Sequence, residues 1–122
     1  MALEKIFSNS FDTAELSVNH ELTTHYYNND YEKVKNTIID ICHGLRQKLM
    51  NVDDNYNEIY IVMPKGEIMV TMIKLSYNVT SVDFKVTTSY LLPCGRGLKM
   101  IKTYYDSLNR QLDLKKIGGY DA

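Results

Sequence analysis

The chain has 122 residues, which is the length of one domain and enough to bury a hydrophobic core without disulfides or metal. Hydrophobic residues make up 44% and charged residues 24%, a balance that excludes a chain disordered by composition. The formal net charge of −1 argues against a protein that binds double-stranded nucleic acid through a broad basic surface. No apolar stretch approaches the roughly 20 residues that cross a bilayer, so we expect one cytoplasmic domain over residues 1–122.

The N-terminal third is expected to contribute an arm and one strand. Residues 1–13 are weakly patterned and could dock as a short arm or a leading strand. From Ala14 to Leu22 apolar and polar residues alternate, which predicts a half-exposed strand. The asparagine-rich segment from Tyr26 to Asp30 is predicted to be a turn.

The first helix is predicted to begin near Asp30. Asn29 is the expected N-cap, with Glu32 three residues later as in a capping box. Apolar residues then recur at steps of three and four, as they do on one buried face of a helix. The polar segment from Asn51 to Asn57 ends the predicted helix. The apolar stripe consists of Val34, Ile38, Ile41, Leu45 and Leu49.

Three strand-like segments follow, over Glu58 to Met63, Glu67 to Tyr77 and Thr80 to Tyr90. Short turns join them, so they must form an antiparallel meander. In the turn Pro64-Lys65-Gly66 we expect Gly66 to take a left-handed conformation. The second strand is partly apolar on both faces, which predicts a central position. The third alternates cleanly, which predicts one wet face.

The sheet is broken before Gly97, and the last helix is predicted from about Leu98 to Leu114. Residues 115–122 are expected to form a frayed tail. The resulting order is β-α-β-β-β-α. Together with one wet sheet face, this order predicts a two-layer α+β sandwich whose antiparallel sheet carries both helices on one side.

A glycine turn leads into the long C-terminal helix, with Gly95 and Gly97 followed by Leu98 to Leu112. In this turn and in its element order, over about residues 14 to 114, the chain resembles small bacterial domains of the helix-grip and TATA-binding-protein-like type. The resemblance implies an α+β fold. It also allows a cleft for an apolar small molecule between the sheet and the C-terminal helix.

The same turn is a candidate anion site. Gly95, Arg96, Gly97 and Lys99 would bring free backbone N–H groups and two cations to a helix N-terminus, an arrangement that suits phosphate or carboxylate. The alternative is a plain strand-to-helix turn whose basic side chains point to water. The turn lacks the Gly-Lys-Ser/Thr ending of a nucleotide-binding P-loop.

No catalytic motif or metal-ligand spacing stands out. His20, His25 and His43 do not combine with Cys42 or Cys94 at the spacing of a zinc site. A nucleophilic thiol at Cys94 would need a histidine from elsewhere in the fold. We therefore expect no metal and no cofactor, and the sequence favours binding over catalysis.

Tyrosine is unusually frequent, with 10 residues and no tryptophan, and six methionines accompany it. Tyrosine and methionine are common both in small cores and at interfaces. Two interpretations therefore remain open: these side chains fill the core, or they line a protein-binding face or an apolar cleft. The candidates for the cleft or interface are Tyr60, Met63, Met69, Met72 and Tyr105.

The sequence thus predicts a non-catalytic binding domain whose partner is a protein. A second copy of the chain is the first candidate, because a homodimer would cover surplus apolar strand surface and an open sheet edge. Two alternatives are an apolar small molecule in the cleft beside the C-terminal helix, and an anion-binding protein or enzyme that uses the turn from Gly95 to Gly97. Nucleic acid and membrane are not expected as partners.

Overall fold

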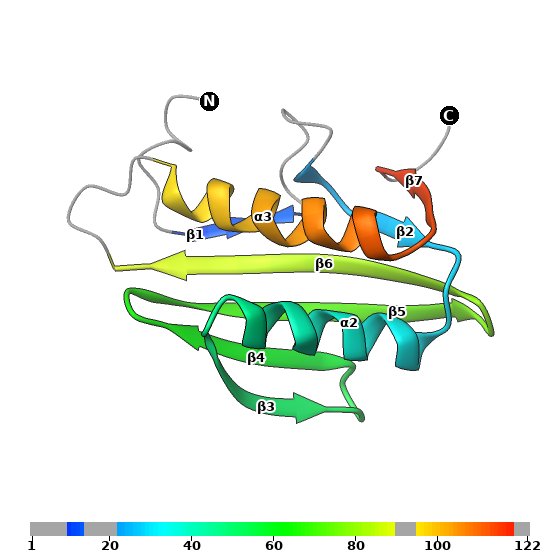
Figure 1. Ribbon diagram of the computed structural model, residues 1–122, viewed down its shortest axis with the longest axis horizontal. Coiled ribbons are helices and arrows are strands. Elements are labelled where there is room, and N and C mark those ends of the chain that lie inside the picture. The colour runs from blue at the N-terminus through cyan, green and yellow to red at the C-terminus, as the bar shows by residue number, and fades with distance from the viewer. Residues whose placement is uncertain (1–9, 14–21, 90–94, 119–122) are drawn as a thin grey trace.

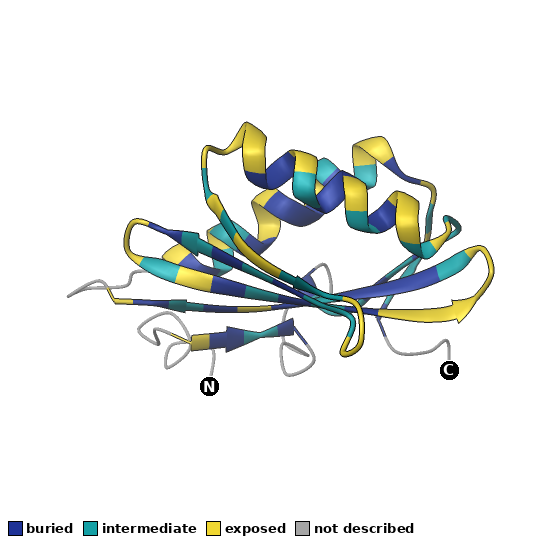
Figure 2. Ribbon diagram, turned by 90° about the horizontal axis from the view of Figure 1, so that it is seen from below, coloured by how far each residue is buried: buried dark blue, intermediate teal, exposed yellow. Residues whose placement is uncertain are grey.

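A computed structural model describes residues 10–13, 22–89 and 95–118. These residues form a seven-stranded antiparallel sheet with two helices on one face, which confirms the predicted α+β sandwich (Figures 1 and 2). The strands lie in the order β3-β4-β5-β6-β2-β7, and β1 also pairs with β6. The elements are β1 (Ser10–Asp12), β2 (His25–Tyr27), α2 (Tyr31–Gly44), β3 (Lys48–Asp53), β4 (Glu58–Met63), β5 (Gly66–Ser76), β6 (Val79–Thr88), α3 (Arg96–Gln111) and β7 (Leu114–Ile117).

The predicted meander of β4, β5 and β6 is confirmed and forms the centre of the sheet. The long strand β6 pairs with β5 along one side. Along its other side it pairs with β2 near its start and with β1 near its end (Figure 1). Residues 10–12 of the N-terminal arm therefore form a leading strand. The strand predicted from Ala14 falls on residues 14–21, which lie outside the described part of the chain.

Helix α2 is capped by Asp30, one residue after the predicted cap. The Asp30 side chain accepts a hydrogen bond of 2.8 Å from the backbone N–H of Lys33. The Asn29 side chain instead accepts one of 2.8 Å from the backbone N–H of Asp113, and so it anchors the approach to β7. Asp30 is the better cap here because its carboxylate also complements the positive end of the helix dipole.

The prediction that α2 extends to Leu49 was wrong. The helix ends at Gly44, and Arg46 reverses the chain with a φ of 59°. Residues 48–53 then form β3, paired with β4. A bulge between Leu49 and Asn51 puts Leu49 and Val52 on the same side of the strand. This spacing of three residues imitates helical periodicity, and it explains why Leu49 seemed to continue the helical stripe.

Two predicted irregular segments are strands. The predicted turn from Tyr26 includes most of β2, and Tyr27 is fully buried. Residues 115–117 of the predicted frayed tail belong to β7, which pairs with β2. Backbone hydrogen bonds of 2.7 Å from Asn28 to Asp113 and from Gly118 to Thr24 fix the ends of this pair. Such short strands are stabilised by distant partners, so local patterns do not reveal them.

Gly66 does not take the predicted left-handed conformation. Its φ is not positive, and it pairs with Met63 as the first residue of β5, so the turn is Pro64-Lys65 alone. A Cβ atom at Gly66 would lie 2.4 Å from the backbone oxygen of Thr87. Glycine is therefore required here by the close approach of β6, not by the backbone dihedral angle.

The core lies between the sheet and the two helices, where aromatic rings pack against each other. Phe84 meets Tyr105 edge to face at 4.9 Å between ring centroids, and His25 stacks on Tyr105 at 3.5 Å. The Tyr105 hydroxyl donates a hydrogen bond of 2.7 Å to the backbone oxygen of Val82.

No helix in the described residues is long and apolar enough to cross a membrane.

Candidate functional site

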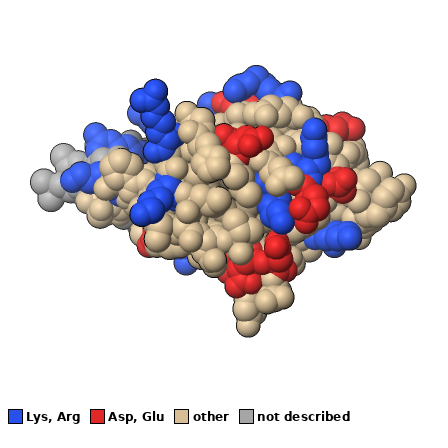
Figure 3. Space-filling view, turned by 60° about the horizontal axis from the view of Figure 1, so that its bottom comes forward, with Lys and Arg blue, Asp and Glu red and all other residues tan. Residues whose placement is uncertain are grey.

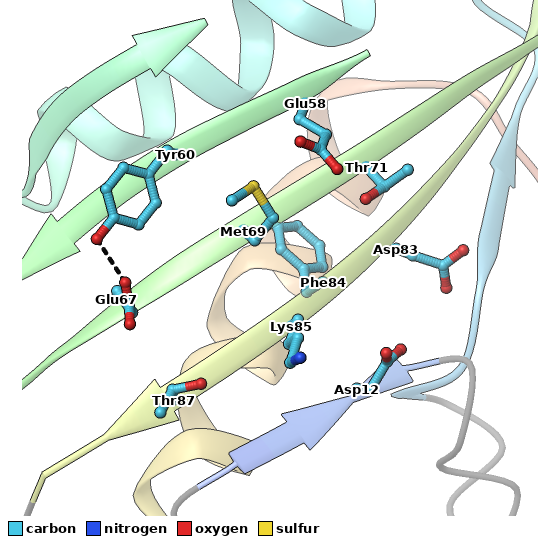
Figure 4. Close-up of a pocket in the computed structure, with 10 residues that line it drawn as sticks. All are labelled: Asp12, Glu58, Tyr60, Glu67, Met69, Thr71, Asp83, Phe84, Lys85 and Thr87. Carbon is cyan, nitrogen blue, oxygen red and sulfur yellow. Dashed lines mark hydrogen bonds between the residues drawn. The ribbon is translucent and has the colours of Figure 1, made fainter. Parts of the chain in front are cut away.

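Helices cover one face of the sheet, while no described helix lies on the other (Figure 2). We call the second face the open face. It carries a hollow of about 410 Å³ that crosses β1, β6, β5 and β4 (Figure 4). The residues that line the hollow are Asp12, Glu58, Tyr60, Glu67, Met69, Thr71, Asp83, Phe84, Lys85 and Thr87.

Strand register arranges the centre of the hollow. Tyr60 lies opposite Met69, Met69 opposite Lys85, and Lys85 opposite Asp12. Side chains at such cross-strand positions contact one another on one face of a sheet. An aromatic ring and a thioether therefore form the middle of the hollow, with a row of polar side chains on either side.

Carboxylates dominate the polar rows. Asp12, Glu58, Glu67 and Asp83 line the hollow together with the ammonium group of Lys85, so its formal charge is negative. The Tyr60 hydroxyl donates a hydrogen bond to Glu67 (Figure 4), and this bond is the main reason why the pKa of Tyr60 is raised. Tyr60 therefore stays a neutral donor beside Glu67 at ordinary pH.

Asp83 is held in place by two threonines, Thr13 and Thr24, which lie on either side of the undescribed residues 14–21. Its Oδ1 atom accepts hydrogen bonds of 2.5 Å from Thr13 and 2.6 Å from Thr24. The Thr13 hydroxyl in turn accepts one of 3.0 Å from the backbone N–H of Phe84. This network ties the segments next to β1 and β2 to the middle of β6, and it fixes a carboxylate in the hollow.

Exposed apolar side chains extend the open face along β5. Ile73 is 46% exposed and Leu75 is 54% exposed, at positions beyond the last β4–β5 pair, which joins Glu58 to Thr71. Tyr77 follows in the turn and is 80% exposed. We call Ile73, Leu75 and Tyr77 the apolar row. Contiguous exposed apolar residues beside a polar hollow are typical of an interaction surface.

The five residues predicted for a cleft or interface are divided between the two faces. Tyr60 and Met69 are cross-strand neighbours on the open face. Met63, Met72 and Tyr105 are buried. The space beside α3 that was to hold an apolar ligand is filled at Tyr105 by its contacts with Phe84 and His25. These three residues pack the core. The sequence did not reveal this, because tyrosine and methionine patterns alone do not distinguish a core from a cleft.

The predicted anion turn forms the start of α3. Gly95 caps the helix with a φ of 74° and without a side-chain hydrogen bond. Gly97 is buried, and a Cβ atom there would lie 2.6 Å from the Phe11 ring, so its role is close packing. Arg96 and Lys99 do come together, at a cavity of about 200 Å³. Its other lining residues are Met63, Thr88, Met100 and Thr103.

In the view of Figure 3, Lys and Arg side chains lie near the grey atoms, along the upper edge and on the opposite side of the molecule. Asp and Glu side chains lie from the middle to that opposite side and at the lower edge, so charges of both signs are interspersed there. A second hollow, of about 510 Å³, lies between α2 and α3 and is lined mostly by exposed polar residues such as Asp40 and Arg110.

The described residues hold no group of three or more side chains that could bind a metal ion. Cys42 is fully buried on α2, where burial raises the pKa of its thiol, so it is not an activated nucleophile. His25 lies in the core, with its Nδ1 atom 2.8 Å from the backbone oxygen of Thr23. His20 and Cys94 lie outside the described residues.

Sequence reasoning missed the carboxylates of the hollow. The pattern placed Asp83 and Lys85 correctly on the wet face of β6. It gave no sign that Asp12 and Glu58 would join them, because strand order cannot be read from local periodicity. The sequence did carry one usable signal for this surface: β5 is apolar on both faces, and the next strand, β6, has one polar face.

Comparisons with protein-family models, with curated proteins and with solved structures found no match to this chain. The resemblance to helix-grip and TATA-binding-protein-like domains therefore stays a prediction.

Proposed function

We propose that this chain is a non-catalytic binding domain that docks a protein partner on its open face. The single observation that carries the proposal is the sheet face that the described residues leave uncovered. Its hollow has Tyr60 and Met69 at the centre and continues into the apolar row. An antiparallel sheet often leaves one polar face in water, and the exposed apolar row is what distinguishes this face as a docking surface.

The extent of the surface supports a protein over a small molecule. The hollow spreads over four strands instead of closing around a ligand, and the apolar row prolongs it along β5. Small-molecule sites bury most of their ligand in a concave pocket. Tyrosine and methionine at the centre of the surface suit a protein interface, since both are enriched there.

The chemistry of the hollow supports binding over catalysis. General acid–base chemistry relies on a carboxyl whose pKa is shifted by an apolar environment. The carboxylates of the hollow instead share an open surface, where Asp83 accepts hydrogen bonds from two threonine hydroxyls and Glu67 accepts one from Tyr60. The buried thiol of Cys42 suits a reducing compartment, so the proposal places the domain in the cytoplasm.

The proposal is tested by native mass spectrometry of the protein purified gently from cells that express it. We expect a bound protein, either another chain or a second copy. The variant Leu75→Lys should lose this added mass, because it puts a charge into the apolar row. Leu45→Lys is the matched control, since Leu45 is exposed on the helix side at the end of α2. A wild-type protein that is always a bare single chain would contradict the proposal.

A second candidate function is anion binding at the start of α3. It is supported by the cavity that Arg96 and Lys99 line together with Thr88. Inorganic phosphate should then raise the melting temperature, and Arg96→Ala should abolish the shift. Arg110→Ala, near the other end of the same helix, should leave the shift intact. If phosphate does not stabilise the wild type, this candidate is eliminated.

A further inference from the structure

The charge of the hollow determines what kind of partner fits it. Four carboxylates and one ammonium group surround Tyr60 and Met69. Low-dielectric walls focus the field of such a group, and a Lys or Arg side chain would be attracted from solution. The Tyr60 ring adds a face for a cation–π contact of the kind that Lys116 makes with Tyr26, at 4.9 Å on β2 and β7.

The same charge argues against a second copy on this surface. In a twofold dimer the open face would meet its own copy, so each acidic hollow would oppose either the other hollow or the other apolar row, and neither supplies a cation. Carboxylates buried against carboxylates cost free energy because nothing neutralises them. Edge-to-edge pairing is also hindered at β3, where a bulge at Met50 and the charge of Lys48 interrupt the free edge.

The apolar row determines the rest of the partner. On β5 alternate residues from Glu67 to Ile73 form one line on the open side, and exposed Leu75 follows at a bulge. From Glu67 to Leu75 a strand of this type spans about 27 Å. The half of the line from Glu67 to Thr71 is acidic, since Glu67 lies at its end and Glu58 lies opposite Thr71. The other end is apolar, at Ile73 and Leu75. An extended segment of about eight residues, or a helix of about 18, would cover it.

The hollow is also preorganised for such a segment. Asp83 is fixed by two threonine hydroxyls and Glu67 by the Tyr60 hydroxyl, so both carboxylates are already in place. Each still has acceptor capacity, because a carboxylate offers several lone pairs. Binding therefore does not need to order these side chains, which removes part of the usual entropic cost.

We infer that the open face binds a cationic amphipathic protein segment, with its Lys or Arg side chains in the hollow and its apolar side chains on Ile73 and Leu75. This inference rests on the proposed function and specifies the partner class. It differs from the homodimer expected from the sequence, since charge complementarity selects a different chain.

Fluorescence anisotropy with labelled synthetic peptides tests the inference. The first peptide has lysines in one half and leucines in the other. In the second, glutamates replace the lysines; in the third, serines replace the leucines. We expect the lysine–leucine peptide to bind at least about tenfold more tightly than either counterpart. Added salt should weaken its binding, because part of the attraction is between charges near the surface.

Charge reversal on the protein identifies the face. The double variant Glu58→Lys with Glu67→Lys should weaken binding of the lysine–leucine peptide about tenfold or more. The matched control, Asp40→Lys with Asp106→Lys, changes the same charge on the helix side and should alter binding less than about twofold. If charge reversal prevents folding, Glu58→Gln with Glu67→Gln replaces it, and circular dichroism verifies the fold.

Failure of the inference and failure of the proposed function have different signatures. If a co-purifying protein is lost in Leu75→Lys but the lysine–leucine peptide does not bind, the open face is a docking surface for another partner class and the inference is wrong. A dimer that dissociates in Leu75→Lys overturns it in favour of a second copy. Equal binding of the lysine and glutamate peptides overturns it as well. If neither a protein nor a peptide binds, both proposals fall.

Discussion

The two faces of β6 differ more than any other two regions of the molecule. Phe84 points into the core and is 1% exposed, while the next residue, Lys85, points into the hollow of the open face (Figure 4). The covered face is built from apolar and aromatic contacts. The open face is built from carboxylates, hydroxyls and a few exposed apolar side chains.

This difference teaches how one sheet separates stability from binding. Burial of large apolar side chains supplies most of the free energy of folding, so the covered face carries the stability. Exposed side chains contribute little to stability and are free to serve recognition. Substitutions on the covered face should therefore change stability, and substitutions on the open face should change binding.

The largest effect is expected for Phe84→Ala. It removes a fully buried ring that contacts Tyr104 and Tyr105 and leaves a cavity, so the free energy of unfolding should fall by about 3–5 kcal/mol. Lys85→Ala, the neighbour on the open face, should change it by less than about 0.5 kcal/mol. Urea denaturation measures both. Similar losses in the two variants would contradict the division between faces.

Alkaline pH should also act through the covered face. Burial raises the pKa of the hydroxyl groups of Tyr27, Tyr104 and Tyr105 above the ordinary value of 10.0. The folded state therefore keeps these protons after the unfolded chain releases them. Their stabilising contribution is complete below about pH 10, and it is lost as the pH rises further. The loss is about 1.4 kcal/mol per pH unit for each tyrosine.

Denaturant titrations at several pH values above 10 measure this loss. Tyr104→Phe should reduce the slope of stability against pH by about 1.4 kcal/mol per unit, since one proton fewer is released on unfolding. The same variant should lower stability at neutral pH by about 1 kcal/mol, because the hydroxyl donates a hydrogen bond of 2.6 Å to Gln47. A slope that Tyr104→Phe leaves unchanged would show that this hydroxyl is not buried as described.

Gly66→Ala should destabilise through the contact between β5 and β6. The new methyl group would lie 2.4 Å from the backbone oxygen of Thr87, and backbone cannot move as easily as a side chain. We expect a loss near 3 kcal/mol, at the upper end of the usual cost of overpacking, about 1–3 kcal/mol. Gly44→Ala has open space and should be neutral or stabilising by up to about 1 kcal/mol. Thermal unfolding of both variants makes the comparison, and equal melting temperatures would refute it.

The contrast at Gly66 shows how far the sequence could predict this fold. The alternation of apolar residues was sufficient to predict the strands β4, β5 and β6, because a strand with one buried face has a period of two residues. The role of Gly66 was predictable only in part. A tight turn with glycine suggested a left-handed residue, whereas the requirement comes from Thr87, which is distant in the sequence.

The site was less predictable for a related physical reason. Tyr60 and Met69 were selected as candidates for a cleft or interface because tyrosine and methionine are common at interfaces, and both line the hollow of the open face. The hollow also depends on Asp12, which reaches it only because β1 pairs with the end of β6. Long-range pairing of a three-residue strand leaves no periodic signal in the sequence.

Thr13→Val should have a moderate effect, because Thr13 lies where the two faces are linked. Its hydroxyl donates to Asp83 and accepts from the backbone N–H of Phe84, and valine keeps the shape but loses both bonds. We expect a loss of about 1–2 kcal/mol. Ser76→Ala removes a hydroxyl at the exposed end of β5 and is the control, with a change below about 0.5 kcal/mol. A loss in Thr13→Val no greater than in the control would argue against the network around Asp83.

Tyr60→Phe should have the smallest effect on stability and so gives the sharpest comparison of the faces. It removes the donor to Glu67 but keeps the ring on an exposed surface, so the melting temperature should stay within about 2 °C of the wild type. Binding of the lysine–leucine peptide should also persist, because the ring and the carboxylate of Glu67 both remain. Tyr60→Ala removes the ring and should weaken that binding at least about fivefold, the equivalent of roughly 1 kcal/mol. Weaker binding in Tyr60→Ala with an unchanged melting temperature would show that the open face serves recognition and contributes little to stability. A large drop in melting temperature for Tyr60→Phe would show instead that this face, too, stabilises the fold.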